Sequence, residues 1–504
     1  MIFDAEALPG GWFDERRFDV CVIGSGPAGL TLARKLAAAG KRVALMEGGG
    51  TEISWDSEEL YEGDTVGADY WPLTAARKRF FGGSSNCWSG VCLELDAHDF
   101  EKLPHHPWSG WPIAKTDLDP YREETDAILV LPPERAPPHT LFPNGTERFI
   151  QFDLRQSSGV LLGERYRDEI EASPNLELYL HANLVDLRLD DRLQRVTTGV
   201  FRRFERPEPF SVRADVFALC LGGLENPRFL LNASSQLPFG IGNQHDLVGR
   251  FFNDHPHQEV GTVLLAEPMR NREVYAPAPD FIKQAEILNI ALLCTPETRQ
   301  YALPNELVRS AACRADFLRR LTEALHGMPL VCSEGGIQAY FEQWRQPEQM
   351  LTARLDIAAE QALNPSSRVR LGEETDRFGQ RRIALDWRFS EIDFHTVRTA
   401  ALAFGRLLAE RDVGRLKLAD WLLDESGDFP GPDEARAGGP HHMCTTRMSD
   451  DPRRGVVDRN CRVHGMENLY IGGSSVFATG GHANPTYTIV QLALRLADHL
   501  AITA

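Results

Sequence analysis

The chain has 504 residues, of which 42% are hydrophobic, and its formal net charge is −18. A chain of this size can bury a large core and should divide into more than one folding unit. The acidic balance argues against a nucleic-acid partner, which would need a basic surface. No apolar run reaches the roughly 18 residues of a membrane span, and the N-terminus lacks the basic start of a secretory signal. We therefore expect no membrane association and a cytoplasmic location. The nine scattered cysteines include no CxxC pair, which favours reduced thiols.

The first predicted element is a nucleotide-binding motif near the N-terminus. The apolar run at 20–23 is typical of a buried parallel strand, and Gly24, Gly26 and Gly29 follow it as GxGxxG. These glycines allow a tight turn, close approach of a pyrophosphate and close packing of helix on strand, respectively. A helix and a second apolar run follow, and that run ends in Glu47, which can accept a hydrogen bond from a ribose hydroxyl. The unit predicts a site for NAD or for the adenosine half of FAD.

Two later apolar runs also end in paired glycines: VFALCLGG at 216–223 and NLYIGGS at 468–474. Both predict further parallel strands, whose carboxyl ends meet at the crevice where nucleotides bind. Residues far apart in the sequence would then contact one long cofactor. This arrangement favours FAD over NAD.

The order of these motifs resembles the glucose-methanol-choline (GMC) family of FAD-dependent oxidoreductases. The resemblance also rests on FGGSSNCWSG from 81, HDLVGRFFNDHP from 245, and the stretch 438–500 with its HxxxTxRM and NPTxT patterns. Within the family, GGSSVFATGGHANPTYT is most similar to pyranose oxidases and bacterial glycoside 3-oxidases. The resemblance implies an α/β fold. It would combine a Rossmann-like FAD-binding domain of the GMC type with a substrate-binding domain built on an antiparallel sheet covered by helices.

The two expected domains are discontinuous in sequence. Residues 1–105, 180–255 and 438–504 are assigned to the FAD-binding domain, and residues 106–179 and 256–437 to the substrate-binding domain. In the second domain, the runs 260–266 and 383–389 predict strands, and a long amphipathic helix is expected after the capping residue Ser390. The segment 267–345 has the length of a lid or binding loop, and its role is open.

Two polar residues occupy the family's catalytic positions. His441 stands seven residues before Met448, which is the family's spacing for the catalytic histidine, and Asn484 opens NPTYT at the second position. An imidazole suits proton abstraction because its ordinary pKa of about 6.5 lies near working pH. The resemblance implies that His441 removes a hydroxyl proton while Asn484 orients the C–H bond for hydride transfer to flavin N5. His442 is interpreted as structural.

The resemblance also implies which residues hold FAD. The segment 82–90 is expected to lie over the flavin, with Ser89 near N5. Cys87 stands where fungal pyranose oxidases have a histidine bonded covalently to the flavin, so we expect a non-covalent cofactor. The expected FAD contacts are Gly24, Gly26, Gly29, Glu47, Gly82, Gly83, Ser84, Asn86, Cys87, Ser89, Val185, Gly222, Gly473, Asn484 and Thr486.

A metal site is the rival interpretation of the adjacent His441, His442 and Cys444. These three lack the fourth ligand of a tetrahedral zinc site, and no CxxC or HxxxH motif supplies it. His255 and His257 could share one face of a strand, but DHP also belongs to the family pattern. We therefore expect no metal, and we expect Cys444 to pack at a position where relatives have a small residue.

The resemblance implies oxidation of a secondary ring hydroxyl of a pyranose or glycoside to a keto sugar, with ring position 3 ahead of position 2. Dioxygen or a quinone-like compound would accept the electrons, and the oligomeric state is open. Glu360 and Gln361 are candidates for contact with a sugar hydroxyl, with a solvated edge as the alternative. Core packing is favoured over sugar stacking for Trp88, Trp344 and Trp387. Three other functions stay open: a dehydrogenase of another alcohol (a sugar acid, sterol or aliphatic alcohol), a flavoprotein without catalysis, and an NAD-dependent dehydrogenase.

Overall fold

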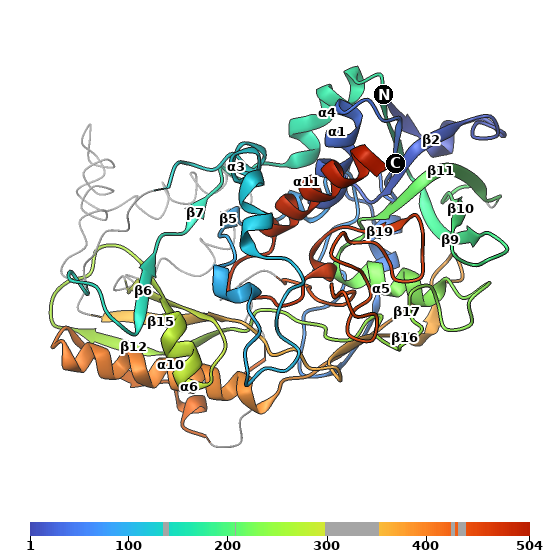
Figure 1. The fold of residues 1–504 in the computed structure, drawn as a ribbon. Helices are drawn as coiled ribbons and strands as arrows, with labels where there is room; N and C mark the ends of the chain where they lie inside the picture. The colour runs from blue at the N-terminus through green and yellow to red at the C-terminus, as the bar shows by residue number, and fades with distance from the viewer. Residues whose placement is uncertain (135–140, 207, 298–351, 425–428, 432–439, 504) are drawn as a thin grey trace, which may run out of the picture.

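A computed structural model describes residues 1–134, 141–206, 208–297, 352–424, 429–431 and 440–503 (Figure 1). The largest sheet is centred on β2 (Arg17–Ile23), the strand that precedes the glycine motif. β2 pairs in parallel with β3 (Val43–Met46) on one side and with β11 (Phe210–Leu219) on the other. The remaining strands of this eight-stranded sheet are β1 (Ile2–Asp4), β8 (Leu176–Leu180), β9 (Asn183–Leu189), β10 (Val196–Arg202) and β19 (Leu469–Ile471).

The parallel part of this sheet contains the strand ends that the glycine motifs follow. β3 continues in parallel to β8 and β1, and β19 lies parallel to β11. Only β10 and β9 run antiparallel, beyond β11. The runs at 216–223 and 468–474 therefore begin as parallel strands, as predicted. In each run the strand ends before the paired glycines.

Helices α1 (Pro27–Ala38) and α11 (Thr486–Thr503) pack against each other beside the large sheet, although they come from opposite ends of the sequence. Figure 1 shows them side by side near both termini. The apolar stripe of α11 is buried at Leu492, Leu496 and Leu500, and Ile489 is half-buried. The other helices of this region are α2 (Trp55–Glu58), α3 (Arg122–Leu129), α4 (Leu162–Ala172) and α5 (Gly222–Asn232).

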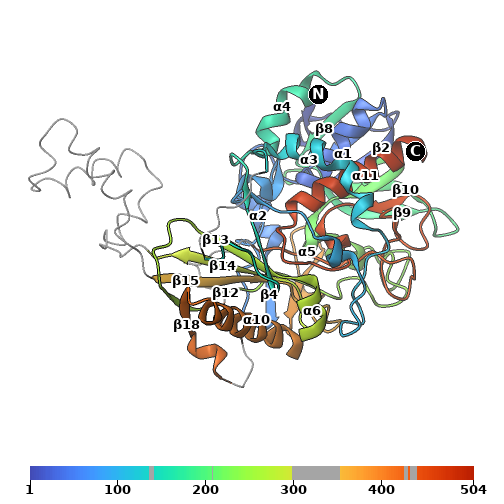
Figure 2. The same cartoon turned by 60° about the vertical axis from the view of Figure 1, so that its left-hand side comes forward.

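The second large sheet is six-stranded and antiparallel, in the order β18-β12-β15-β14-β13-β6. Its strands are β6 (Phe149–Phe152), β12 (His257–Leu265), β13 (Glu273–Pro277), β14 (Ile290–Pro296), β15 (Thr352–Ala359) and β18 (Gly414–Leu418). Helix α10 (Glu391–Glu410) runs along one face of this sheet, as Figure 2 shows. Ser390 and Asp393 form a capping box at its start, which confirms the predicted helix start. The shorter α6 (Pro279–Ala285) precedes β14.

A small sheet joins segments that we had assigned to different domains. β17 (Arg381–Trp387) pairs with β16 (Arg368–Thr375) and, in parallel, with β4 (Gly63–Gly67). The run at 383–389 is therefore a strand, but it lies outside the six-stranded sheet. A two-stranded sheet, β5 (Val91–Cys92) with β7 (Arg155–Gln156), makes a similar link.

The segment 106–179 also departs from the expected division. β8 lies inside the large sheet, and the buried residues of α3 and α4 belong to the core around that sheet. The apolar residues of α3 and α4 pack in the core around this sheet, in which β8 lies between β3 and β1. The part of 106–179 that holds α3, α4 and β8 therefore belongs with the Rossmann-like region.

The described residues also bear on membrane-spanning helices and on the state of the cysteines. No helix among them is long and apolar enough to cross a membrane. The cysteines in the described ranges are free thiols.

The packing of α10 on the six-stranded sheet predicts a large loss of stability for Phe404→Ala. Phe404 is fully buried, and its ring centroid lies 5.3–5.9 Å from those of Tyr275, Phe149 and Phe142. Truncation should lower the free energy of unfolding by about 3–5 kcal/mol, measured by urea titration with tryptophan fluorescence. Phe239→Ala is the matched control: Phe239 is 78% exposed, so the change should stay within about 0.5 kcal/mol. Equal effects in the two variants would contradict the described core.

Candidate active site

One cavity of about 1030 Å³ is lined by residues from both large sheets. Its walls include the loop after β2, the loop between β11 and α5, the segment 83–89 and the loop at 440–442. Strands β12, β13, β14 and β15 supply another wall. Small-molecule sites usually occupy roughly 300–1,000 Å³, so this cavity suits a long cofactor together with a substrate.

The glycine loop after β2 is shaped by close backbone contacts. Gly24 has φ +101°, and a Cβ there would lie 2.5 Å from the carbonyl oxygen of Cys220. A Cβ at Gly29 would lie 1.8 Å from the carbonyl oxygen of Gly24, so α1 can approach β2 only if residue 29 is glycine. Gly24 and Gly26 line the cavity, whereas Gly29 does not. Gly29 is therefore a packing residue rather than a cofactor contact.

Glu47 follows β3 and lines the cavity beside the glycine loop. Its Oε2 accepts hydrogen bonds from the backbone N–H of Ser25 at 3.0 Å and from the Ser25 hydroxyl at 2.6 Å. Its Oε1 accepts from the backbone N–H of Gly49 at 2.8 Å. The Glu47 carboxylate thus holds the loop after β2 and the loop after β3 in place. It lies where a ribose hydroxyl of a dinucleotide would bind.

The shape of the cavity fits FAD. A side chain at Gly26 or Gly222 would project into open space, which leaves room for a pyrophosphate at the start of α1 and for cofactor atoms at the start of α5. No side chain caps the N-terminus of α1, so its backbone N–H groups remain available to an anion. Val185, Gly222, Gly473 and Thr486 also line the cavity, which brings the expected contacts from distant segments together.

The segment 82–90 lies against the glycine loop. Gly83, Ser84, Cys87 and Ser89 line the cavity, and a Cβ at Gly83 would lie 2.9 Å from Cα of Gly26. The expected contacts Gly82 and Asn86 do not line it. Asn86 Nδ2 instead donates to the carbonyl oxygen of Phe81 at 2.9 Å, so this side chain holds the local turn.

The adjacent His441, His442 and Cys444 do not converge on one point. The ring of His441 faces His255, whereas the ring of His442 lies beside Tyr70 and Phe252, with centroids 6.0 and 5.9 Å away. The carbonyl oxygen of His442 accepts from the Ser474 hydroxyl at 2.6 Å. Cys444 is fully buried, and burial raises the pKa of its thiol, so it is suited neither to nucleophilic attack nor to binding a metal together with His441.

Asp254 holds the backbone of both neighbouring histidines. Its Oδ1 accepts from the backbone N–H of His441 at 2.8 Å and of His255 at 2.7 Å, and its Oδ2 accepts from the Tyr70 hydroxyl. Burial raises the pKa of this carboxyl to about 6, although all three donors act to lower it. Gln361 Oε1 in turn accepts from the Asp254 backbone N–H at 3.1 Å.

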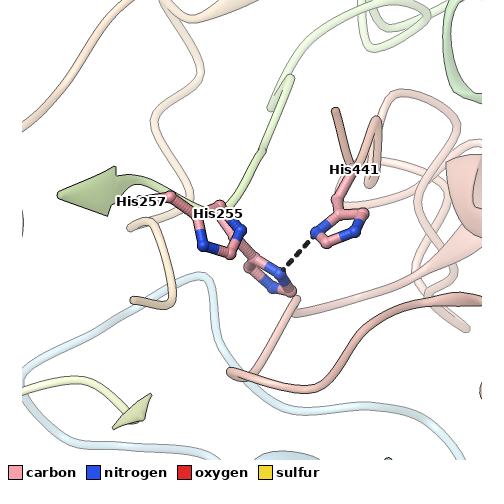
Figure 3. A group of neighbouring side chains, drawn as sticks. All are labelled: His255, His257 and His441. Carbon is pink, nitrogen blue, oxygen red and sulfur yellow. Dashed lines mark hydrogen bonds between the residues drawn. The ribbon is translucent and has the colours of Figure 1, made fainter. Parts of the chain in front are cut away.

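Three histidine rings meet at the cavity wall (Figure 3). His257 begins β12, His255 precedes it, and His441 reaches them from the facing loop. The Nδ1 atoms of His255 and His441 are 3.0 Å apart, so one ring donates a hydrogen bond to the other. Burial lowers the pKa of His255 to about 3 and of His257 to about 4, and it lowers the pKa of His441 well below its ordinary value. All three rings are therefore neutral near pH 7.

Asn484 and His482 lie on the same wall of the cavity. Asn484 Nδ2 donates to the carbonyl oxygen of Val91 at 3.0 Å, which fixes the amide plane. The His482 ring is buried, and its centroid lies 5.2 Å from that of Phe152. Neither ring nitrogen of His482 has a hydrogen-bond partner among the described residues.

Another part of the cavity wall combines apolar and charged side chains. Phe152, Leu154, Val274 and Leu293 line the cavity there. Arg354 and Asp356, on one face of β15, form an ion pair with Nε and Oδ2 2.8 Å apart.

Glu360 and Gln361 follow β15, but neither lines the cavity. Glu360 Oε2 accepts from the backbone N–H of Asn289 at 3.2 Å, and burial, with the nearby Asp99, raises the pKa of Glu360 to about 8. Gln361 Nε2 donates to the carbonyl oxygen of Arg388, and Trp387 donates to Gln361 Oε1. The structure thus places both side chains in buried hydrogen-bond networks outside the cavity lining. Trp88 lines the cavity, Trp387 is buried, and Trp344 lies outside the described residues.

The functional candidates that sequence reasoning missed are His482, Arg354 and Asp356. His482 had a usable signal, because it stands two residues before Asn484 and directly after paired glycines. The alternation of Arg354, Asp356 and Ala358 on a strand was visible as well. Nothing in the sequence, however, showed that this face of β15 borders the cofactor cavity.

Comparison with known proteins agrees with this geometry. A family model described as GMC oxidoreductase matches residues 364–493, and one described as FAD binding domain matches residues 19–55. The 2-methyl-1,2-propanediol dehydrogenase of Mycolicibacterium austroafricanum is 23% identical, over 96% of this chain and 95% of that protein. The 6'''-hydroxyparomomycin C oxidase of Streptomyces lividus is 24% identical, over 97% and 92%.

The solved structure of pyridoxine 4-oxidase from Mesorbium loti has the same fold. It superposes with a TM-score of 0.55 at 18% identity and covers 95% of this chain and 98% of its own. The family models, the two relatives and the cavity beside the glycine loop point to one assignment. The chain belongs to the GMC family and is an FAD-dependent oxidoreductase that acts on CH–OH groups.

Proposed function

We propose that this enzyme oxidises a secondary ring hydroxyl of a pyranose or glycoside to a keto sugar, with position 3 ahead of position 2. The observation that carries the proposal is the position of His441. Its neutral ring lines the same cavity as the glycine loop, and Asn484 and residues of the expected flavin segment line that cavity too. A proton acceptor, a hydroxyl-orienting amide and the cofactor site thus share one enclosed space.

The hydrogen bond between His441 and His255 determines which nitrogen can act as the base. Only one hydrogen can lie between the two Nδ1 atoms, which are 3.0 Å apart. When His441 donates that hydrogen, its Nε2 carries the free lone pair and can accept the proton of a substrate hydroxyl. His255 then acts as a positioning residue, because it selects the reactive tautomer of His441.

Asn484 would orient the substrate. Its Nδ2 already donates one hydrogen to Val91, which leaves the amide oxygen and the second hydrogen for a hydroxyl group. Bound FAD supplies the acceptor for the hydride that leaves the substrate carbon. The protein contributes position and proton transfer, and dioxygen or a quinone-like compound would reoxidise the cofactor.

The substrate side of the cavity supports a ring that carries several hydroxyl groups. Phe152, Leu154 and Val274 offer an apolar surface for the C–H face of a sugar ring. Arg354 and Asp356 offer hydrogen-bond donors and acceptors beside it. Such a mixture of apolar surface and a few polar groups is typical of sites that orient small polar molecules.

A second candidate function is the oxidation of another alcohol. One relative is named as a dehydrogenase of 2-methyl-1,2-propanediol and another as an oxidase of 6'''-hydroxyparomomycin C. The same base and the same amide would serve any primary or secondary alcohol that reaches them. The substrate, rather than the chemistry, separates the two candidates.

The base assignment predicts that His441→Ala slows flavin reduction by about 10²–10⁴-fold while FAD remains bound. Rates should be measured anaerobically, by bleaching of the flavin absorbance in a stopped-flow instrument. His499→Gln is the control, because it also removes one imidazole but lies on α11 beside Tyr470, outside the cavity lining. Unchanged bleaching in His441→Ala would refute the assignment.

The ring position is tested with deoxy sugars. We expect glucose and 2-deoxyglucose to bleach the flavin anaerobically and 3-deoxyglucose to leave it oxidised, because the reacting hydroxyl is then missing. Readmission of air reports whether dioxygen is the acceptor. Bleaching by 3-deoxyglucose but not by 2-deoxyglucose would move the reaction to position 2. Bleaching only by non-sugar alcohols would favour the second candidate.

The cofactor is predicted to be non-covalent. Cys87 lies within the expected flavin segment and lines the cavity, and partial desolvation raises the pKa of its thiol, which makes it a weaker nucleophile. Acid precipitation should leave a colourless pellet and a yellow supernatant. A yellow pellet that becomes colourless in Cys87→Ser would show a cysteinyl link and contradict this prediction.

A further inference from the structure

The rings of His255, His257 and His441 form a cluster of nitrogen donors. One ring nitrogen from each histidine lies within 4.8 Å of the other two. The ring centroids are 5.0 Å apart for His255 and His441, 5.8 Å for His257 and His441, and 6.4 Å for His255 and His257. Figure 3 shows the three rings turned toward a common space.

We propose that His255, His257 and His441 bind a divalent transition-metal cation such as Zn²⁺ or Cu²⁺, and that the bound cation blocks proton transfer by His441. The first half of this proposal is a new site in the chain. The second half rests on the proposed role of His441 as the base.

One nitrogen–nitrogen distance already suits a three-histidine metal site, and the other two are at most 4.8 Å. Zinc–nitrogen bonds of about 2.0–2.1 Å in a tetrahedron place the ligand nitrogens about 3.3 Å apart. The Nδ1 atoms of His255 and His441 are already 3.0 Å apart, so small ring movements would admit an ion. His257 and His441 line the cavity, which provides an entry path and space for a water molecule as the fourth ligand.

The donor chemistry selects the class of ion. Imidazole nitrogens prefer Zn²⁺, Cu²⁺ and Ni²⁺, whereas Mg²⁺ and Ca²⁺ prefer oxygen ligands. The three rings offer one nitrogen each within 4.8 Å of the other two, and none of these nitrogens belongs to a carboxylate or a thiol. The Asp254 carboxylate, which holds the backbone of His255 and His441, places a negative group next to the site and fixes two of its ligands.

A bound cation would take the lone pair that the reaction needs. His441 cannot coordinate a metal and accept a hydroxyl proton at the same nitrogen. If the metal instead binds the other ring nitrogen, the ring hydrogen must lie on the nitrogen that faces the substrate, and that nitrogen then has no lone pair to accept a proton. In both cases, rising metal occupancy should lower the rate of flavin reduction.

The direct test is metal binding by the FAD-loaded enzyme, measured without turnover. Equilibrium dialysis should show one Zn²⁺ at this site per chain, and Cu²⁺ should give an EPR spectrum with nitrogen hyperfine splitting, since oxidised flavin is EPR-silent. His257→Gln should weaken Zn²⁺ binding by at least about tenfold, because loss of an indirect contact to a ligand already costs that much. FAD content and melting temperature would show whether the variant is folded.

Two controls separate this site from other metal-binding groups. Asp96, His98 and Asp99 form another group of potential ligands, so His98→Gln is included as a variant. His499→Gln removes a histidine outside both groups. The proposal expects Zn²⁺ affinity to be unchanged in both variants. Loss of binding in His98→Gln together with full binding in His257→Gln would overturn it.

The activity readout distinguishes this proposal from the proposed function. If Zn²⁺ does not bind the wild-type enzyme at millimolar concentration, the metal site is refuted, while the effect of His441→Ala on flavin reduction stands. If Zn²⁺ binds and the variants behave as expected, but flavin reduction is undiminished at full occupancy, the inhibitory half is refuted and His441 is not the base. Inhibition that follows occupancy and is weakened in His257→Gln supports both halves.

Discussion

The active site depends on one buried carboxylate. Asp254 accepts hydrogen bonds from the backbone of His441, from its own neighbour His255 and from Tyr70, and these residues come from three separate segments. Burial disfavours the charge, and the three donors offset part of that cost. The histidine rings converge because this carboxylate fixes the two backbones that carry them. The Asp254 backbone N–H donates to Gln361 Oε1, so a residue that was a candidate for sugar contact belongs to the network that holds His441.

The parts that could be predicted from the sequence are those determined by local physics. The dinucleotide loop follows from a strand, three glycines and an acidic residue within thirty positions, and the Gly29–Gly24 contact shows why glycine is needed there. The start of α10 follows from Ser390 and Asp393, which satisfy the first N–H groups of the helix. His441 and His442 have different ring neighbours, because adjacent side chains of an extended loop point in different directions.

The parts that could not be predicted depend on contacts between distant residues. The pairing of His441 with His255 spans 186 positions, and no pattern in either segment encodes it. The run Leu176–Leu180 alternates like a half-buried strand, so its place inside the large sheet, between β1 and β3, was hidden. Likewise, the runs at 260–266 and 383–389 look alike, although one lies in the six-stranded sheet and the other pairs with β4. The local sequence pattern predicts that a strand forms, whereas tertiary packing determines which strand it pairs with.

The neighbouring positions of α1 and α11 have a consequence for how the protein is made. α1 is synthesised well before α11 and β19, which pack beside it and extend its sheet. Ribosomes add about 5–20 residues per second, so on the order of half a minute or more separates the synthesis of the two regions. Until then the cavity lacks the part of its wall that Gly473 and Thr486 form. The cavity is therefore complete only after the segment through Thr486 has been made.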